Sequence, residues 1–158
     1  MANPFPFASG DVLTAAELND IGAWTSFTPS FVSGVTVGNA TIEAAYITLN
    51  QITFVYVDFI LGSTSAITGD VRLSLPVNAL GATVGTFTVA AFLQGNAYDF
   101  SASGYYKLMG RAFDNSSVRI TASAANTTYV QYASLGSTAP FTWTTNDHLT
   151  FSTYYRSA

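Results

Sequence analysis

The sequence predicts an all-β protein, an antiparallel β-sandwich of about eight strands with a jelly-roll-like arrangement. Three observations predict this class. Aromatic residues make up 15% of the chain and charged residues only 9%, against about 25% charged residues in an average globular domain. Apolar residues make up 49%, which excludes a disordered chain. Thr, Val and aromatic side chains favour strands, and short apolar stretches recur at the spacing typical of sandwiches.

The N-terminal part of the chain differs from the rest, so we divide the protein into a segment at residues 1–23 and a β domain at residues 24–158. The segment begins with an extended arm and continues into a predicted short helix. Thr14 and Glu17 form a capping box at its start, and Gly22 suits the left-handed residue that ends it. So short a helix is unstable alone, and its apolar side chains must dock on another surface. The predicted anchoring residues are Phe5, Phe7, Leu13, Leu18 and Ile21.

From Trp24 onward, apolar and polar side chains alternate in a series of short stretches, as they do in half-buried strands. Pro76 ends one of these strands, and Asn50 forms a tight corner between two others. Asp114-Asn115-Ser116 predicts a turn in which the side chains bond to their own backbone. The predicted strands are Thr41–Leu49, Gln51–Leu61, Val71–Leu75, Val84–Leu93, Tyr105–Phe113, Val118–Ala122, Thr128–Ser134 and His148–Tyr155.

The stretch from Ile52 to Leu61 is apolar on both of its faces. An antiparallel sheet usually keeps one face polar, so a neighbouring subunit or the N-terminal segment is expected to cover the second face. A central strand beneath a long loop is the alternative. With so few charges, a monomer would also expose large apolar patches. The sequence therefore predicts oligomerisation, with Phe54, Tyr56 and Phe59 at the interface.

The sequence carries few groups suited to catalysis. There is one histidine and no cysteine, which leaves few ways to build a transition-metal site. His148 follows Asp147, but neighbours on a strand point to opposite faces and form no dyad. The carboxylates are widely separated, and no Gly-rich phosphate loop or nucleophile elbow occurs. We therefore predict a non-enzymatic protein without catalytic, metal or cofactor sites.

The charge pattern and the apolar stretches restrict the partners. The net charge is −4, and the five basic residues are scattered along the sequence, whereas phosphate binding needs several clustered cations. We predict no nucleic-acid binding. The N-terminus has no basic region before an apolar run, so it is not a signal peptide. The most apolar stretch is too short for a membrane helix, and we expect cytoplasmic synthesis without membrane insertion.

Tyrosines occur in groups, and adjacent pairs such as Tyr105-Tyr106 place one ring on each face of a strand. The outward ring lies at a subunit interface or in the core in most proteins, and it can also stack on a sugar. Residues 94–105 and 134–146 are rich in Gly, Ser, Asn and Tyr, as recognition loops are. The candidate receptor contacts are Tyr98, Tyr105 and Trp143.

Residues 10–19, GDVLTAAELN, resemble the opening segment of many bacteriophage tail-fibre and minor virion proteins. The aromatic-Thr-Pro run at residues 24–31, the Gly-Asn-Ala-Thr turn at 38–41 and the Ser-Leu-Pro strand end at 74–76 follow in the same order. The resemblance spans about residues 10 to 77. It implies a trimeric β-sandwich domain in a virion appendage that attaches to the host or decorates the particle. No long shaft or repeat lies between the N-terminal segment and the β domain, so we expect a short appendage and not a long fibre.

These observations lead to one main hypothesis and two alternatives. We expect a virion structural protein, a short homotrimeric tail fibre or tip that binds other virion proteins through its N-terminal segment. Its expected ligand is host surface polysaccharide, because stacking by Tyr and Trp needs no charge. The first alternative is a capsid decoration or head-fibre protein. The second is a carbohydrate-binding module or a polysaccharide-degrading enzyme.

Overall fold

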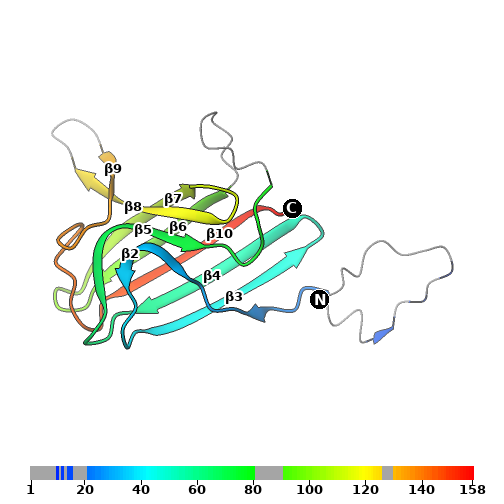
Figure 1. Cartoon of the computed structure of the whole chain (residues 1–158), viewed down its shortest axis with the longest axis horizontal. Helices are drawn as coiled ribbons and strands as arrows, with labels where there is room; N and C mark the ends of the chain where they lie inside the picture. The colour runs from blue at the N-terminus through cyan, green and yellow to red at the C-terminus, as the bar shows by residue number, and fades with distance from the viewer. Residues whose placement is uncertain (1–9, 11, 13, 16–20, 81–90, 126–129) are drawn as a thin grey trace.

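The computed structural model describes residues 10, 12, 14–15, 21–80, 91–125 and 130–158. It confirms the all-β class: all the elements of the described residues are strands, and they pair antiparallel in one sheet (Figure 1). The helix predicted near residues 14–22 falls mostly on residues 16–20, which lie outside the described part. Gly22 has the left-handed backbone expected of it, with φ 88°.

In the part of the chain that the structure describes, ten strands form the sheet, and nine of them follow the order β1-β3-β4-β10-β6-β7-β8-β5-β2. The ninth strand, β9, pairs with β8 beside β5, because β5 covers only the first residues of β8. The bounds are β1 Thr25–Ser26, β2 Phe31–Thr36, β3 Thr41–Leu49, β4 Ile52–Ile60, β5 Ala66–Ser74, β6 Ala91–Asp99, β7 Gly104–Ala112, β8 Ser117–Ala125, β9 Val130–Ser134 and β10 His148–Arg156.

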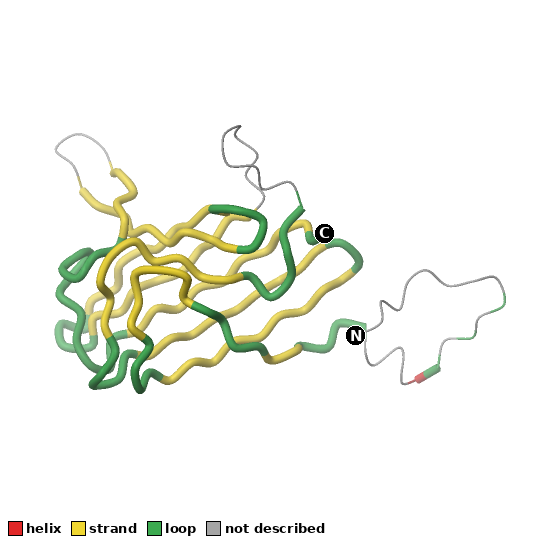
Figure 2. Tube along the Cα trace, in the orientation of Figure 1, coloured by secondary structure: helices red, strands yellow, loops and turns green. Residues whose placement is uncertain are grey.

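The sheet curls so that its two ends approach each other across one core. The ring of Phe31 on β2 packs edge-on against the ring of Phe59 on β4, with centroids 4.8 Å apart. These strands stand far apart in the order of the sheet, so only curling brings them together (Figures 1 and 2). The two separate sheets of a sandwich or jelly roll are not confirmed, since the strands belong to a single hydrogen-bonded sheet.

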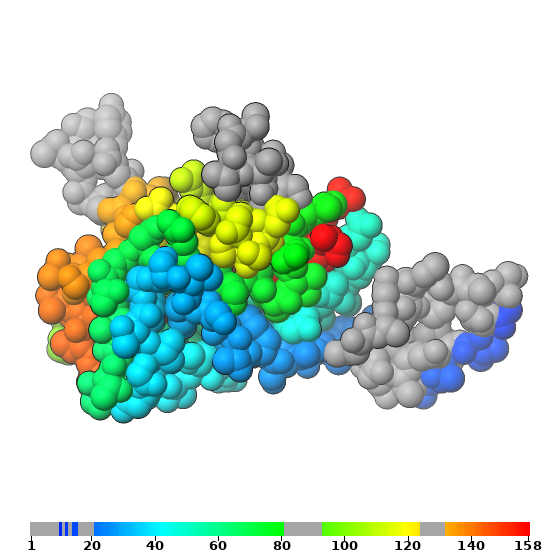
Figure 3. Space-filling view, viewed as in Figure 1, coloured from blue at the N-terminus to red at the C-terminus, as the bar shows by residue number. Residues whose placement is uncertain are grey.

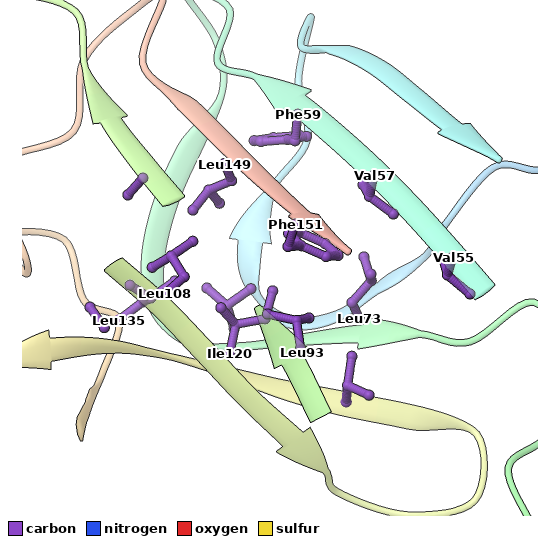
Figure 4. Packing of buried hydrophobic residues seen from close by; sticks show 14 of the residues in the cluster. Val55, Val57, Phe59, Leu73, Leu93, Leu108, Ile120, Leu135, Leu149 and Phe151 are labelled. Atoms are coloured by element: carbon purple, nitrogen blue, oxygen red, sulfur yellow. The ribbon is translucent and has the colours of Figure 1, made fainter. Parts of the chain in front are cut away.

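The core consists of the side chains on the inner face of this curled sheet. Odd-numbered residues of β4, β6 and β10 point inward, as do even-numbered residues of β7 and β8. The largest of these side chains meet at the centre (Figure 4). Those with less than 2% exposure include Val57, Phe59, Leu73, Leu93, Leu108, Ile120 and Leu149. The chain therefore completes its hydrophobic core without a second copy.

Two glycines on the inner face allow adjacent strands and side chains to come close. A Cβ added to Gly95 on β6 would collide with the carbonyl oxygen of Thr150, and one added to Gly110 would lie 2.6 Å from the carbonyl oxygen of Arg119. Both distances are shorter than non-bonded atoms tolerate, so a larger residue would push the strands apart. Glycine at these positions fits the tight curl of the sheet.

The prediction for the middle of the chain was wrong in one place. Residues 94–105 were expected to form a recognition loop, but β6 continues to Asp99. Exposed Gln94 and Asn96 alternate with buried Gly95 and Ala97, and such small inner residues give a weak strand pattern. Most of the predicted strand Val84–Leu93 lies at residues 81–90, outside the described part. β1 and β2 were not predicted, because β1 is very short and Gly34 interrupts β2.

Aspartates hold several of the turns at the ends of the strands. Ser116 donates from both its backbone N–H and its Oγ to Asp114 Oδ1, at 2.8 and 2.9 Å, which confirms the predicted turn. Asp99 holds a similar turn: it accepts hydrogen bonds from Ser101 and Ala102, and these bonds lower the pKa of its carboxyl group. Asp147 is fully buried and accepts hydrogen bonds from the backbone N–H groups of Phe100 and Thr144. These bonds replace water for carboxylates at the edge of the core.

The C-terminal strand is attached to the loop after β5 by a buried tyrosine. The Tyr155 hydroxyl donates to the carbonyl oxygen of Val77 at 2.7 Å. Burial raises the pKa of Tyr155 to about 12, so the phenol is neutral and remains a donor at ordinary pH. The bond therefore fixes the end of β10 to the chain that follows β5.

The two faces of β4 provide a test of this architecture. Replacing buried Phe59 by Ala should lower the free energy of unfolding by about 3–5 kcal/mol, because it opens a cavity in the core. The matched change Phe54→Ala, on the outer face of the same strand, should lower the free energy of unfolding of the monomer much less. Urea denaturation of both variants measures the difference. Similar losses for the two would contradict the assignment of inner and outer faces.

Candidate functional site

The outer face of the strands β3, β4, β10, β6 and β7 carries large side chains in contact with solvent. Tyr105 is 74% exposed and Tyr154 is 63% exposed. Because the core is complete on the inner face, the fold does not need these aromatic rings. A row of exposed aromatic and apolar groups on a sheet face usually marks a contact surface. We therefore take this outer face as the candidate functional site.

At one end of the outer face, four aromatic side chains form a group that we call the tyrosine cluster: Tyr98, Phe100, Tyr105 and His148. The rings of Tyr98 and Tyr105, opposite each other on β6 and β7, have centroids 4.6 Å apart and an interplanar angle of 34°. Tyr98 also contacts Phe100 and His148 edge-on. The cluster offers exposed ring faces on which a flat apolar group can stack.

Polar groups lie beside the tyrosine cluster. Thr150 Oγ1 donates to Asp58 Oδ1 at 2.7 Å, and the same oxygen lies 3.9 Å from His148 Nδ1. Asn96 and Gln94 are exposed on β6, and their side chains make no hydrogen bond within the described part of the chain. Together, these groups can accept and donate hydrogen bonds next to a stacked ligand.

The His148 side chain lies near that of Asp58 and not near that of Asp147, its neighbour in the sequence. Asp147 and His148 point to opposite faces, as predicted, and Asp147 bonds to backbone groups instead. Asp58 comes close to His148 because β4 pairs with β10, where Asp58 lies opposite Thr150. Only the strand register, which places Asp58 beside Thr150, 92 positions later in the chain, brings this carboxylate to the histidine.

At the other end of the outer face lies an apolar patch formed by Leu49, Ile52, Phe54 and Tyr154. These side chains are 39–63% exposed, and the rings of Phe54 and Tyr154 have centroids 6.1 Å apart. A Cβ added to Gly22 would lie 3.5 Å from Cδ1 of Ile47, the outer-face neighbour of Leu49. The chain that leads from the N-terminal segment therefore reaches the sheet beside this patch.

A third area of the outer face is basic, and we call it the cation row: Arg72, Arg119, Arg111 and Lys107. Arg119 on β8 lies opposite Arg72 on β5 and opposite Arg111 on β7. Lys107 lies on the same face of β7, two outward positions before Arg111. β2, β5 and β8 lie next to one another on the side seen in Figure 3. All five basic residues of the chain therefore lie on the outer face of the sheet. The four of the cation row, although scattered in the sequence, gather on β5, β7 and β8, whereas Arg156 lies on β10.

One carboxylate compensates part of the cation row. Arg72 Nη2 donates to Asp70 Oδ2 at 2.9 Å, and Arg119 Nε donates to Asp70 Oδ1. Arg119 Nη2 also donates to Ser134 Oγ on β9, at 2.7 Å. The guanidinium carbon of Arg72 lies 3.6 Å from the ring centroid of Phe113. This network holds β8 to both β5 and β9 where the sheet forks.

The residues predicted as receptor contacts do not all meet. Tyr98 and Tyr105 stack together, but Trp143 lies apart from them and packs against Phe141, with ring centroids 4.3 Å apart. Its indole N–H donates to the carbonyl oxygen of Gly136 at 3.0 Å, and Phe141 belongs to the core. Trp143 therefore closes one end of the core and is only partly exposed.

The residues predicted at the oligomer interface divide between the two faces of β4. Phe54 and Tyr56 lie on the outer face, and burial together with nearby Asp58 and Glu43 raises the pKa of Tyr56. Phe59 is fully buried in the core. Of the predicted anchoring residues, only Ile21 is described, and it is partly buried. Phe5, Phe7, Leu13 and Leu18 lie outside the described residues.

Comparison with protein-family models, with curated proteins and with solved structures gives no match. Across the described residues, no group of three or more His, Asp or Glu side chains is placed to hold a metal ion. The same part of the chain contains no helix long and apolar enough to span a membrane. The function must therefore be inferred from the outer face itself.

The ion pairs of Asp70 generate a prediction about stability. Asp70→Asn leaves three adjacent arginines without a counter-charge, and like charges opposite each other destabilise a sheet. We expect the free energy of unfolding to fall by about 1 kcal/mol at low ionic strength and by less in about 1 M salt, where the charges are screened. Urea denaturation at both salt concentrations measures this. Adding Arg111→Gln should recover part of the loss, and a loss insensitive to salt would contradict the electrostatic cause.

Proposed function

We propose that the protein is a non-enzymatic structural protein of a bacteriophage particle, a short homotrimeric tail fibre or tip that attaches to the host cell surface. The order of motifs in residues 10–77 supports a virion protein. The observation that carries the proposal is the outer face of the sheet, which exposes the apolar patch at one end and the tyrosine cluster at the other. Two separate contact areas suit a protein that binds its own copies and a second surface.

The apolar patch supports assembly with further copies of this chain. Leu49, Ile52, Phe54 and Tyr154 expose apolar area that the monomer's own core does not use. Burying such side chains stabilises an assembly by about 25 cal/mol per Å² of apolar surface. The N-terminal segment reaches the sheet beside the same patch. In the proposed trimer, the segments of the three copies would therefore leave the assembly close together and anchor it to the virion.

The tyrosine cluster supports attachment to a saccharide surface. Its exposed rings can stack on the apolar face of a sugar, and the side chains of Asn96, Gln94 and Asp58 can bond to the hydroxyl groups around it. A single contact of this kind is weak. Three copies in one trimer raise the effective concentration of each site, so that weak contacts combine into firm attachment.

Light scattering tests the assembly. The full-length protein and residues 24–158 should both have the mass of three chains, because the apolar patch belongs to the β domain. The double variant Phe54→Ser/Tyr154→Ser should be monomeric. Tyr132→Ser, which removes an exposed aromatic ring from β9, serves as the matched control and should remain trimeric. A monomeric wild-type protein would refute the fibre proposal.

Particle and cell binding distinguish a fibre from a decoration protein. Deletion of residues 1–23 should abolish binding to virions in both cases. Tyr105→Ala should reduce attachment of the trimer to host cells at least tenfold, because loss of a stacking ring typically removes about 0.5–1.5 kcal/mol per site and three sites act together. Fluorescently labelled trimer on host cells measures this, with Tyr132→Ala as control. Unchanged attachment by the Tyr105 variant would favour the decoration protein.

A further inference from the structure

Half of the cation row is not required by the fold, because Arg111 and Lys107 take no part in the network that holds β8 to β5 and β9. In a protein of net charge −4, four positive charges stand against the single carboxylate that pairs with them in the described part of the chain, that of Asp70. Arg111 lies opposite Arg119, and like charges at opposed positions destabilise a sheet. Neutral polar residues at these outward positions would avoid that repulsion. Because these exposed cations lower the stability of the fold, we expect them to serve in binding a ligand.

Two members of the row are available to a ligand. Arg111 and Lys107 are exposed, and the side chain of neither forms a hydrogen bond or ion pair within the described residues. Arg72 and Arg119 are held by Asp70, Ser134 and Phe113, with about 30% of each side chain still exposed. The row therefore combines two fixed guanidinium groups with two free cations. Strands lie about 4.8 Å apart, so successive arginines present charges at short, regular steps.

The chemistry of the row indicates acidic oxygen groups as the ligand. A guanidinium group binds carboxylate, phosphate or sulfate oxygens through two parallel hydrogen bonds. Tyr105 occupies the outward position next to Lys107 on β7, and its ring belongs to the tyrosine cluster. An extended ligand can thus stack a ring on the cluster while its acidic groups meet the cations. Duplex DNA fits less well, because its bases are stacked on one another and offer no free ring face to Tyr105, so that only phosphate contacts to a few cations remain.

We propose that the cation row and the tyrosine cluster form one binding site for an acidic polysaccharide, with Lys107 and Arg111 pairing with its charged groups and Tyr105 with a sugar ring. This inference rests on the proposed attachment function, because it names the ligand class of the same outer face. It adds charge recognition to stacking, so the site discriminates acidic from neutral polymers.

Isothermal titration calorimetry on the full-length protein tests the site with four probes: polygalacturonate, dextran sulfate, neutral dextran and duplex DNA. We expect the two acidic polysaccharides to bind at low ionic strength and to bind more weakly as salt increases. Neutral dextran and DNA should bind much more weakly. Arg111→Gln and Lys107→Gln should each weaken the binding of the acidic polysaccharides about fivefold, the effect of losing one exposed charge pair. Tyr105→Ala should weaken it as well.

Arg156→Gln is the matched control, because it removes the same charge from a side chain outside the row that donates to Gln51. Its affinity should equal that of the wild type. Four results would overturn the inference: no binding of either acidic polysaccharide, equal or tighter binding of DNA, an equal loss in the control, or a change of assembly mass in Arg111→Gln. The last result would place the row at a subunit interface.

The two proposals fail in different experiments. Failure of polysaccharide binding, with trimer mass and cell attachment as expected, removes only the acidic ligand. If the acidic polysaccharides bind in calorimetry although the protein is monomeric or does not attach to cells, the fibre proposal is refuted and the polysaccharide-binding site is supported.

Discussion

The contact between the two ends of the curled sheet is the constraint on which the rest of the structure depends. Phe31 on β2 meets Phe59 on β4, and this contact closes the core of a single sheet. Strands that are neighbours cannot bury each other's inner faces, so a flat sheet of this sequence would have no interior. Curling solves the problem, and it requires small residues such as Gly95 and Gly110 where strands and side chains crowd.

Because the core is complete on the inner face, most of the outer face is not needed for folding. The exception is the network of Arg72, Asp70 and Arg119, which holds β8 to β5. Elsewhere on that face the side chains need only be compatible with solvent. In a protein with so few charges, Ser and Thr would be sufficient at all of these positions. It presents three groups instead: the apolar patch, the tyrosine cluster and the cation row. Each departs from what stability alone favours, because exposed aromatic area and opposed arginines both cost free energy. For this reason the outer face informs on function more than the core does.

The three areas are placed so that they can act together. The apolar patch and the tyrosine cluster lie at opposite ends of the long strands β4 and β10, so assembly at one end leaves the other exposed. The cation row extends from β7 toward β5, next to the cluster. The strands β10 and β6 separate it from Asp58 and Glu43 on the outer face of β4 and β3. A basic area on an acidic protein directs a charged ligand to one side of the sheet.

Sequence alone determined the all-β class, most of the strands, the Asp114 turn and the exposed ring of Tyr105, because alternation and turn chemistry act between neighbours in the chain. It could not determine which strands pair. Register decided that Asp58 meets His148, that Tyr98 stacks on Tyr105, and that three arginines far apart in sequence become neighbours. Curling decided that Phe59 is core and Trp143 an end cap. Pairing and curling depend on contacts between distant residues, whose positions no local pattern encodes.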